Sequence, residues 1–228
     1  AKLQSLGSEQ GKKVFTNHGA TGVCYGVRVA DMKVIGKQIK NQQQLAMDLY
    51  DTGVIDAMYL AGLVADGAKM TKKQLQHWAE KATSPIISEY TVAWVASESP
   101  YGHELGMEWI DSENEHIASS GWGTLSALVA MKEDAALDMK ELKSLLERVQ
   151  KTIHNAPNRV RYTMNNFVIA LGSYVSAFTT AAMEAGKKIG KVEVNMGNTA
   201  CKVPSSPEYI KKIKDMGKIG AKRKTVKC

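Results

Sequence analysis

The stretch LAMDLYDT at residues 45–52 aligns without gaps on LGMEWIDS at residues 105–112, and related leucine-led stretches begin at residues 75 and 145. The gapless match includes both apolar and acidic positions. A helical hairpin that recurs every 30 to 40 residues is typical of an α-solenoid, because one hairpin cannot bury its apolar face alone and neighbours must stack. An irregular helical bundle is the alternative. The positions expected to be buried in a comparable way are Leu45, Leu75, Leu105 and Leu145.

Helical periodicity continues through almost the whole chain. Ser8 is a predicted N-cap for a first short helix, and breaks such as Thr83-Ser84-Pro85 place capping residues where new helices begin. We therefore expect a HEAT-like or armadillo-type repeat domain over residues 1–190. An extended segment, a short helix and a basic tail, packed on the repeats or following them, are expected over residues 191–228. The predicted helices cover residues 31–40, 45–50, 55–64, 75–81, 86–96, 105–111, 115–131, 142–154 and 159–174, with a last helix from residue 206.

Composition is that of an ordinary globular protein, since 44% of the 228 residues are hydrophobic and 23% are charged. Three widely spaced cysteines form no C-x-x-C motif, which indicates reduced thiols in a cytoplasmic protein. The start of the chain has no apolar run of the secretory type. The uncharged run from Tyr162 to Met183 holds too many polar side chains for a membrane span, and it predicts a pair of buried helices instead.

Positive charge is concentrated at the C-terminal end. Residues 187–228 hold twelve Lys and Arg against three Asp and Glu, whereas residues 1–186 have a net charge of −2. Clustered lysines beside a near-neutral body indicate a nucleic acid or another polyanion as partner, and a tail that only keeps the protein soluble is the alternative. Residues 218–228 are expected to be mobile.

The chain carries GVR at residues 26–28 with ADMKVIGK at 30–37, the hairpin that starts at residue 45, MEWI at 107–110 and NRVR at 158–161. Through these segments, roughly residues 5–190 resemble the HEAT-like-repeat DNA alkylation repair proteins, which include alkylpurine DNA glycosylases. The resemblance implies a basic concave face that holds duplex DNA by its backbone. In the glycosylases, a Trp and an Asp four residues later on one helix lie beside the damaged nucleotide, and further aromatics and an Arg complete the site.

The resemblance implies that the helix at residues 86–94 corresponds to this catalytic helix. The register that matches the family's Thr-Val step places Glu89 at the Trp and Ala93 at the catalytic Asp. The chemistry requires a carboxylate at the catalytic position, because cleavage of an N-glycosidic bond develops positive charge on the sugar, which an anion stabilises. Glu89 is the only carboxylate on this helix and is therefore the catalytic candidate, with a solvated or salt-bridged role as the favoured alternative. The family's Arg falls near Ala118 or Ser119 and is absent.

Candidate DNA contacts are basic residues at helix starts and in the tail, together with aromatics that can stack on bases. For Trp94 and Trp122, helical spacing makes packing in the core the favoured role. The predicted DNA-binding residues are Lys33, Lys37, Tyr90, Trp94, Arg159, Arg161, Tyr162, Lys222, Arg223 and Lys224.

No sequence motif indicates a metal or a cofactor. His103 and His116 stand near several glutamates, but no His-x-x-x-His or His-x-x-Glu spacing organises them, so we expect no metal site. The absence of G-x-S-x-G, Walker and G-x-G-x-x-G motifs argues against hydrolase, nucleotide-binding and dehydrogenase functions.

The sequence thus predicts a cytoplasmic, nucleoid-associated protein that binds double-stranded DNA, resembles DNA alkylation repair enzymes and releases alkylated bases weakly or not at all. A protein–protein scaffold whose basic tail binds an acidic partner is the alternative, since helical solenoids commonly serve as scaffolds.

Overall fold

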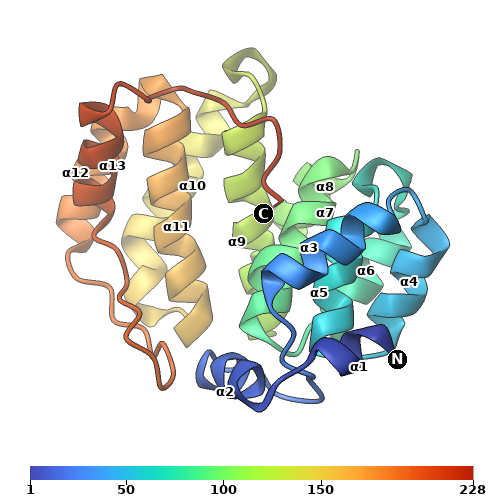
Figure 1. Cartoon of the computed structure of the whole chain (residues 1–228). Helices are drawn as coiled ribbons and strands as arrows, with labels where there is room; N and C mark the ends of the chain where they lie inside the picture. The colour runs from blue at the N-terminus through green and yellow to red at the C-terminus, as the bar shows by residue number, and fades with distance from the viewer. Residues whose placement is uncertain (228) are drawn as a thin grey trace.

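The computed structural model describes residues 1–227, and within them the protein is built from helices with no strand (Figure 1). Cys228 lies outside the described residues. The short 3₁₀ turns and the π-helical segment η2 are included in the numbering of the elements. The elements are α1 (Lys2–Leu6), α2 (Glu9–Asn17), α3 (Val29–Gln38), α4 (Gln43–Asp51), α5 (Ile55–Val64), η1 (Gly67–Lys69), α6 (Lys72–Lys81), η2 (Ile87–Val92), α7 (Ala93–Glu98), α8 (Gly102–Trp109), α9 (Glu115–Met131), η3 (Asp134–Ala136), α10 (Met139–Thr152), η4 (Ile153–Asn155), α11 (Asn158–Tyr174), η5 (Ser176–Phe178), α12 (Thr179–Ile189) and α13 (Ser206–Asp215).

Helical hairpins stack in chain order, as the solenoid prediction requires. α4 packs along α5, α6 contacts η2, α8 packs along α9, and α10 contacts α11. The second helices form a continuous inner row, in which α5 contacts η2, both η2 and α7 contact α9, and α9 packs extensively along α11. α12 and α13 close the C-terminal end by packing on α11 (Figure 1). The predicted α-solenoid is therefore confirmed.

Each half of the solenoid has its own apolar core. Residues 15–109 supply the first core and residues 110–210 supply the second. Leu75 and Leu105 are fully buried in the first core, and Leu145 is buried in the second. Burial of these side chains is the main source of stability, at about 25 cal/mol for each Å² of apolar surface removed from water.

The prediction for Leu45 is wrong, because this side chain is only half-buried. α4 turns Ala46, Met47 and Tyr50 toward the core instead. The alignment of the two hairpins still holds, since Ala46 and Tyr50 fall on Gly106 and Ile110, which are also buried. The repeat therefore holds at these positions, and α4 differs from α8 in that its first leucine, Leu45, is half-buried whereas Leu105 is buried.

Local capping and helix boundaries largely follow the sequence. Ser8 caps α2 by accepting a hydrogen bond from the Gly11 backbone N–H, and α5 and α9 have the predicted limits. The predicted helix at residues 86–96 differs from expectation, because its first half, η2, is π-helical. A π-helical turn is wider than an α-helical one and is frequent at functional sites. This wider turn carries Glu89.

The C-terminal tail, defined here as residues 216–227, is not free of the body. It leaves α13, passes α11 and reaches α9 (Figure 1), where the Gly220 N–H donates to the Ser173 carbonyl at 2.9 Å and the Arg223 N–H donates to the Ala130 carbonyl at 2.8 Å. Val226 packs against the first core. The prediction of a mobile tail is wrong for residues 218–227, because helix carbonyls and an apolar contact hold the segment.

Among the described residues, no single helix is long and apolar enough to cross a membrane, although α11 and residues 176–189 meet the criteria together as a pair bent by 114°. The run from Tyr162 to Met183 belongs to this pair, whose side chains contribute to the second core. The prediction of two buried helices is confirmed. The cytoplasmic location stays a prediction.

Candidate nucleic-acid interface

The inner row of helices carries a buried ion pair between Glu89 of η2 and Arg159 of α11. Arg159 donates from Nε to Oε1 of Glu89 at 2.6 Å and from Nη2 to Oε2 at 2.8 Å. Such a bidentate, charge-assisted arrangement is the strong form of this interaction. The Glu89 side chain is 2% exposed and that of Arg159 is 13% exposed. The salt-bridged alternative for Glu89 is therefore confirmed as its role in this structure.

The other groups of Arg159 are also engaged. Its backbone N–H donates to Oε1 of Glu115 at 2.6 Å, and Nη1 donates to the sulfur of Met196 at 3.3 Å. The guanidinium also lies 4.6 Å from the ring centroid of Tyr162, which is a cation–π contact. Arg159 therefore joins η2, α9, α11 and the segment that follows α12. This role differs from the predicted phosphate contact, because the guanidinium is already paired.

Burial governs the titration of these groups. It raises the pKa of Glu89, and the hydrogen bonds from Arg159 act in the opposite direction. Burial lowers the pKa of Arg159, but the Glu89 carboxylate more than compensates, so the net direction is upward. Burial also lowers the pKa of His116, whose ring Nδ1 lies 3.4 Å from the Ser88 hydroxyl. The pair adds no net charge to the inner face, so any attraction for an anion must come from other residues.

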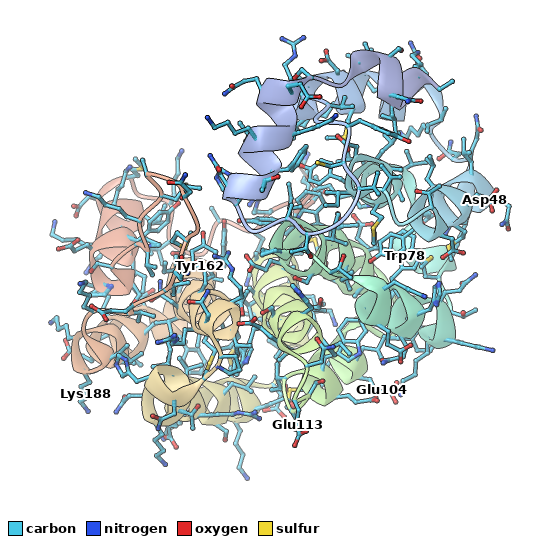
Figure 2. The ribbon with its side chains drawn as sticks, turned by 90° about the horizontal axis from the view of Figure 1, so that it is seen from below. Asp48, Trp78, Glu104, Glu113, Tyr162 and Lys188 are labelled. Carbon is cyan, nitrogen blue, oxygen red and sulfur yellow. The ribbon has the colours of Figure 1, made fainter. Side chains whose placement is uncertain are left out.

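Tyr90 and Tyr162 line a cavity of about 610 Å³ beside this ion pair, which we call the tyrosine cavity. Tyr90 is 39% exposed although it lies on the inner row. Burial raises the pKa of the Tyr90 hydroxyl, and the nearby Tyr162 and Glu89 add to the effect, so this hydroxyl stays protonated at neutral pH. Figure 2 shows Tyr162 on α11, beside the opening between the N-terminal helices and the C-terminal segment.

A second hollow of about 310 Å³, the inner groove, lies on the other side of Tyr90. Ala93 and Gly123 form part of its floor, and Arg223 and Val226 of the tail form part of its wall. Ala93 is 1% exposed, and a Cβ added to Gly123 would lie 2.9 Å from the Ala93 Cβ. The position expected for the family's catalytic Asp is thus an alanine at a close contact between two helices.

Two lysines fasten the tail to opposite halves of the solenoid. Lys222 lies 2.8 Å from the carboxylate of Asp134, beyond the end of α9. Lys227 lies 2.8 Å from the carboxylate of Glu98, at the end of α7. Their side chains are 11% and 15% exposed, so both charges are partly desolvated. The ammonium of Lys222 is paired in this structure, and the contact of Lys222 with DNA stays a prediction.

The remaining predicted DNA contacts differ in how exposed their side chains are. Trp94 is buried, and its ring packs edge-on against Tyr59 and Tyr90, so the core-packing alternative is confirmed for Trp94. Trp94 also lines the inner groove, and its contact with DNA stays a prediction. Lys33 and Lys37 are exposed on α3.

Three predicted basic residues form no ion pair with another described residue. Arg223 and Lys224 are exposed on the tail, and no described residue pairs with either side chain. Arg161 is half-buried on α11, and its Nε is a buried atom that has no hydrogen-bond partner among residues 1–227. The exposed side chains of Arg223 and Lys224 could donate hydrogen bonds to phosphate oxygens without first breaking an ion pair.

Sequence reasoning missed the contribution of the segment before α13. Met196, Cys201 and Lys202 line the tyrosine cavity, and Cys201 Sγ lies 3.6 Å from Nε2 of His18 near the end of α2. Met196 contacts Arg159. The weak alternation of residues 192–196 indicates an extended segment, but it holds no signal for where that segment lies.

No group of three or more His, Cys, Asp or Glu side chains that could hold a metal ion occurs within residues 1–227. His103 pairs with Glu141 at 2.7 Å, and His116 stands apart from it beside Ser88. The two histidines therefore belong to different surroundings.

The stacked hairpins define a HEAT-like-repeat α-solenoid. The chain belongs to the DNA alkylation repair enzyme family, because the sequence model of that family matches residues 1–203. Uncharacterized protein Lmo0209 of Listeria monocytogenes is 33% identical over 95% of this chain and 96% of its own length. Uncharacterized protein Lin0241 of Listeria innocua is 32% identical over 94% of this chain and 95% of its own length.

A solved structure is also similar to the whole chain. It is 36% identical, with a TM-score of 0.91, and the match covers 100% of this chain and 97% of that one. It is described as representing a new family of proteins related to the HEAT-like repeat DNA glycosylases with affinity for branched DNA structures. The predicted family and its helical-repeat fold are confirmed.

Proposed function

We propose that this protein binds DNA along the inner face of its solenoid, prefers branched over linear duplex DNA, and does not excise alkylated bases efficiently. The observation that carries the proposal is the 0.91 TM-score match, over the whole chain, to a relative with affinity for branched DNA. The second support is the alanine at position 93, where the register of the resemblance expects the catalytic Asp.

Charge supports DNA as the partner. Arg161, Arg223 and Lys224 have no ion-pair partner among the described residues, and Lys202 is exposed at the mouth of the tyrosine cavity. The tail brings Arg223 to the inner groove, where α7 and α9 present uncharged residues. Phosphate contacts position a protein on DNA without selecting a sequence, so this arrangement suits recognition of shape.

The carboxylates of the inner face argue against the family's chemistry. An oxocarbenium-like transition state needs a nearby anion, and the absence of such an anion typically costs about 10²–10³ in rate. Ala93 supplies none, and the Glu89 carboxylate is held by two hydrogen bonds from Arg159. Glu89 as a catalytic residue therefore remains a prediction that only base-release measurements can decide.

The test compares a four-way junction with a linear duplex of the same base composition, by fluorescence anisotropy over a range of salt concentrations. We expect tighter binding of the junction. Replacing Arg223 and Lys224 with Gln should make the log–log salt slope shallower by about 0.9 for each phosphate that the variant no longer neutralises. Replacing Lys140 and Lys143, which are exposed on the outer helix α10, is the matched control.

Equal affinity for both substrates would remove the preference for branched DNA. Undetectable binding of either substrate at low salt would overturn the proposed function, and the protein–protein scaffold would become the better account.

A further inference from the structure

The tyrosine cavity adjoins the inner groove, where the resemblance places the family's catalytic position, and the two share only Glu89 and Tyr90. Segments far apart in the chain enclose it: α2 and residues 26–29, the start of η2, the start of α11, and residues 196–202. The Cys201–His18 contact at 3.6 Å brings the N-terminal and C-terminal segments together at its edge. Its volume of about 610 Å³ is in the range of cavities that take a ligand of nucleotide size.

The walls of this cavity suit a flat aromatic group. Val14, Phe15, Val27 and Ile86 supply apolar surface. Tyr90 supplies an aromatic ring, and the residue is 39% exposed, which is unusual for a large residue on the inner row. An exposed aromatic ring in a recess can stack on any base, because every base has a π face.

The charged side chains at the edge of the tyrosine cavity favour a nucleotide, which carries a phosphate, over an uncharged ring. Lys202 is exposed at the edge of the cavity, and no described residue pairs with its ammonium. Arg28 also lines the cavity, with a side chain that is 79% exposed and paired with Asp31 at 2.8 Å. The floor holds the Glu89–Arg159 pair, whose charges balance. Net positive charge therefore lies at the rim, where a phosphate attached to an inserted base would be.

We propose that the tyrosine cavity binds one unpaired nucleotide, with its base against Tyr90 and Tyr162 and its phosphate at Lys202. This inference rests on the proposed DNA-binding function and names the feature of DNA that the protein recognises. A paired base cannot enter, because it is held in the stack, whereas an unpaired base leaves the stack at small cost. Branch points, where strands exchange partners, are places at which bases lose a stacking neighbour.

The experiment uses a duplex with a single bulged 2-aminopurine and the same duplex with that base paired. Wild-type protein should bind the bulged duplex more tightly, with a change in 2-aminopurine fluorescence on binding. Tyr90→Ala should lower affinity for the bulged duplex about tenfold more than affinity for the paired duplex, since stacking on one aromatic is worth that much. Tyr90→Phe should keep the preference.

Tyr209→Ala is the matched control, because Tyr209 is 45% exposed but lies on α13 outside the cavity. Lys202→Gln is a second variant that touches no core residue, and it should also reduce the preference for the bulge. Thermal melting checks that each variant is folded.

Three outcomes distinguish this inference from the proposed function. If the wild type binds junctions but does not distinguish bulged from paired duplex, the nucleotide site is wrong and the proposed function stands. If neither Tyr90→Ala nor Lys202→Gln changes the preference, the bulge is recognised elsewhere and the inference is overturned. If no DNA is bound at all, both fail.

Discussion

At the scale of single residues, the Glu89–Arg159 pair shows what sequence can and cannot reveal. The sequence marks both residues, but as a catalytic carboxylate and a phosphate contact. They are 70 residues apart, and their pairing depends on how η2 and α11 flank α9. Nothing in the local pattern around either residue encodes that geometry. Once they are buried together, each neutralises the other, and both predicted roles lose the free group on which they depended.

A double-mutant cycle tests whether this pair holds the inner row together. Glu89→Gln and Arg159→Met should each lower the free energy of unfolding by about 3–5 kcal/mol, because each leaves a buried charge without its partner. The double variant should lose clearly less than the two single losses combined. Urea denaturation measures all four proteins.

The exposed pair Glu184–Lys187 on α12 is the control for this cycle, since both side chains are more than half exposed and water screens them. Its cycle should show no measurable coupling. Independent, additive losses at Glu89 and Arg159 would mean that the two side chains are not paired in solution.

At the scale of elements, the apolar period locates the helices well, because each repeat buries one stripe of side chains. α5 and α9 have the predicted limits, and Ser8 caps α2 as expected. The prediction for the tail is wrong, because its lysines dominate the local sequence pattern. Its attachment depends on Asp134 and Glu98, which no sequence window brings near the tail.

Removing the two lysines of this attachment should free the tail. Replacing Lys222 and Lys227 together with Gln removes both ion pairs and the hydrogen bonds of the two ammonium groups to the Val129 and Ala65 carbonyls. Amide hydrogen exchange at Arg223 should become at least about tenfold faster, while exchange in α5 and α9 stays unchanged. The variant with Lys140→Gln and Lys143→Gln should exchange like the wild type. Unchanged exchange at Arg223 would show that the two lysines do not hold the tail.

At the scale of the whole molecule, a near-neutral solenoid is joined to a basic extension that folds back onto its inner face. The charge asymmetry is visible in the sequence, and the repeat pattern together with scattered motifs leads to the correct family. The sequence does not reveal where the basic tail lies in the folded protein. The tail brings Arg223 to the inner groove, which Ala93 also lines. The molecule therefore combines the family's scaffold with the inner face that we propose binds DNA, and residue 93 supplies no carboxylate there.

The most direct test of this account is release of alkylated bases from duplex DNA at protein concentrations that saturate binding, with unmodified duplex as the control substrate. The account predicts that the wild-type protein occupies the alkylated DNA fully and releases bases no faster than the protein-free reaction. Release well above that background would contradict it. If that release disappeared in folded Glu89→Gln protein at the same occupancy, Glu89 would be the catalytic carboxylate after all.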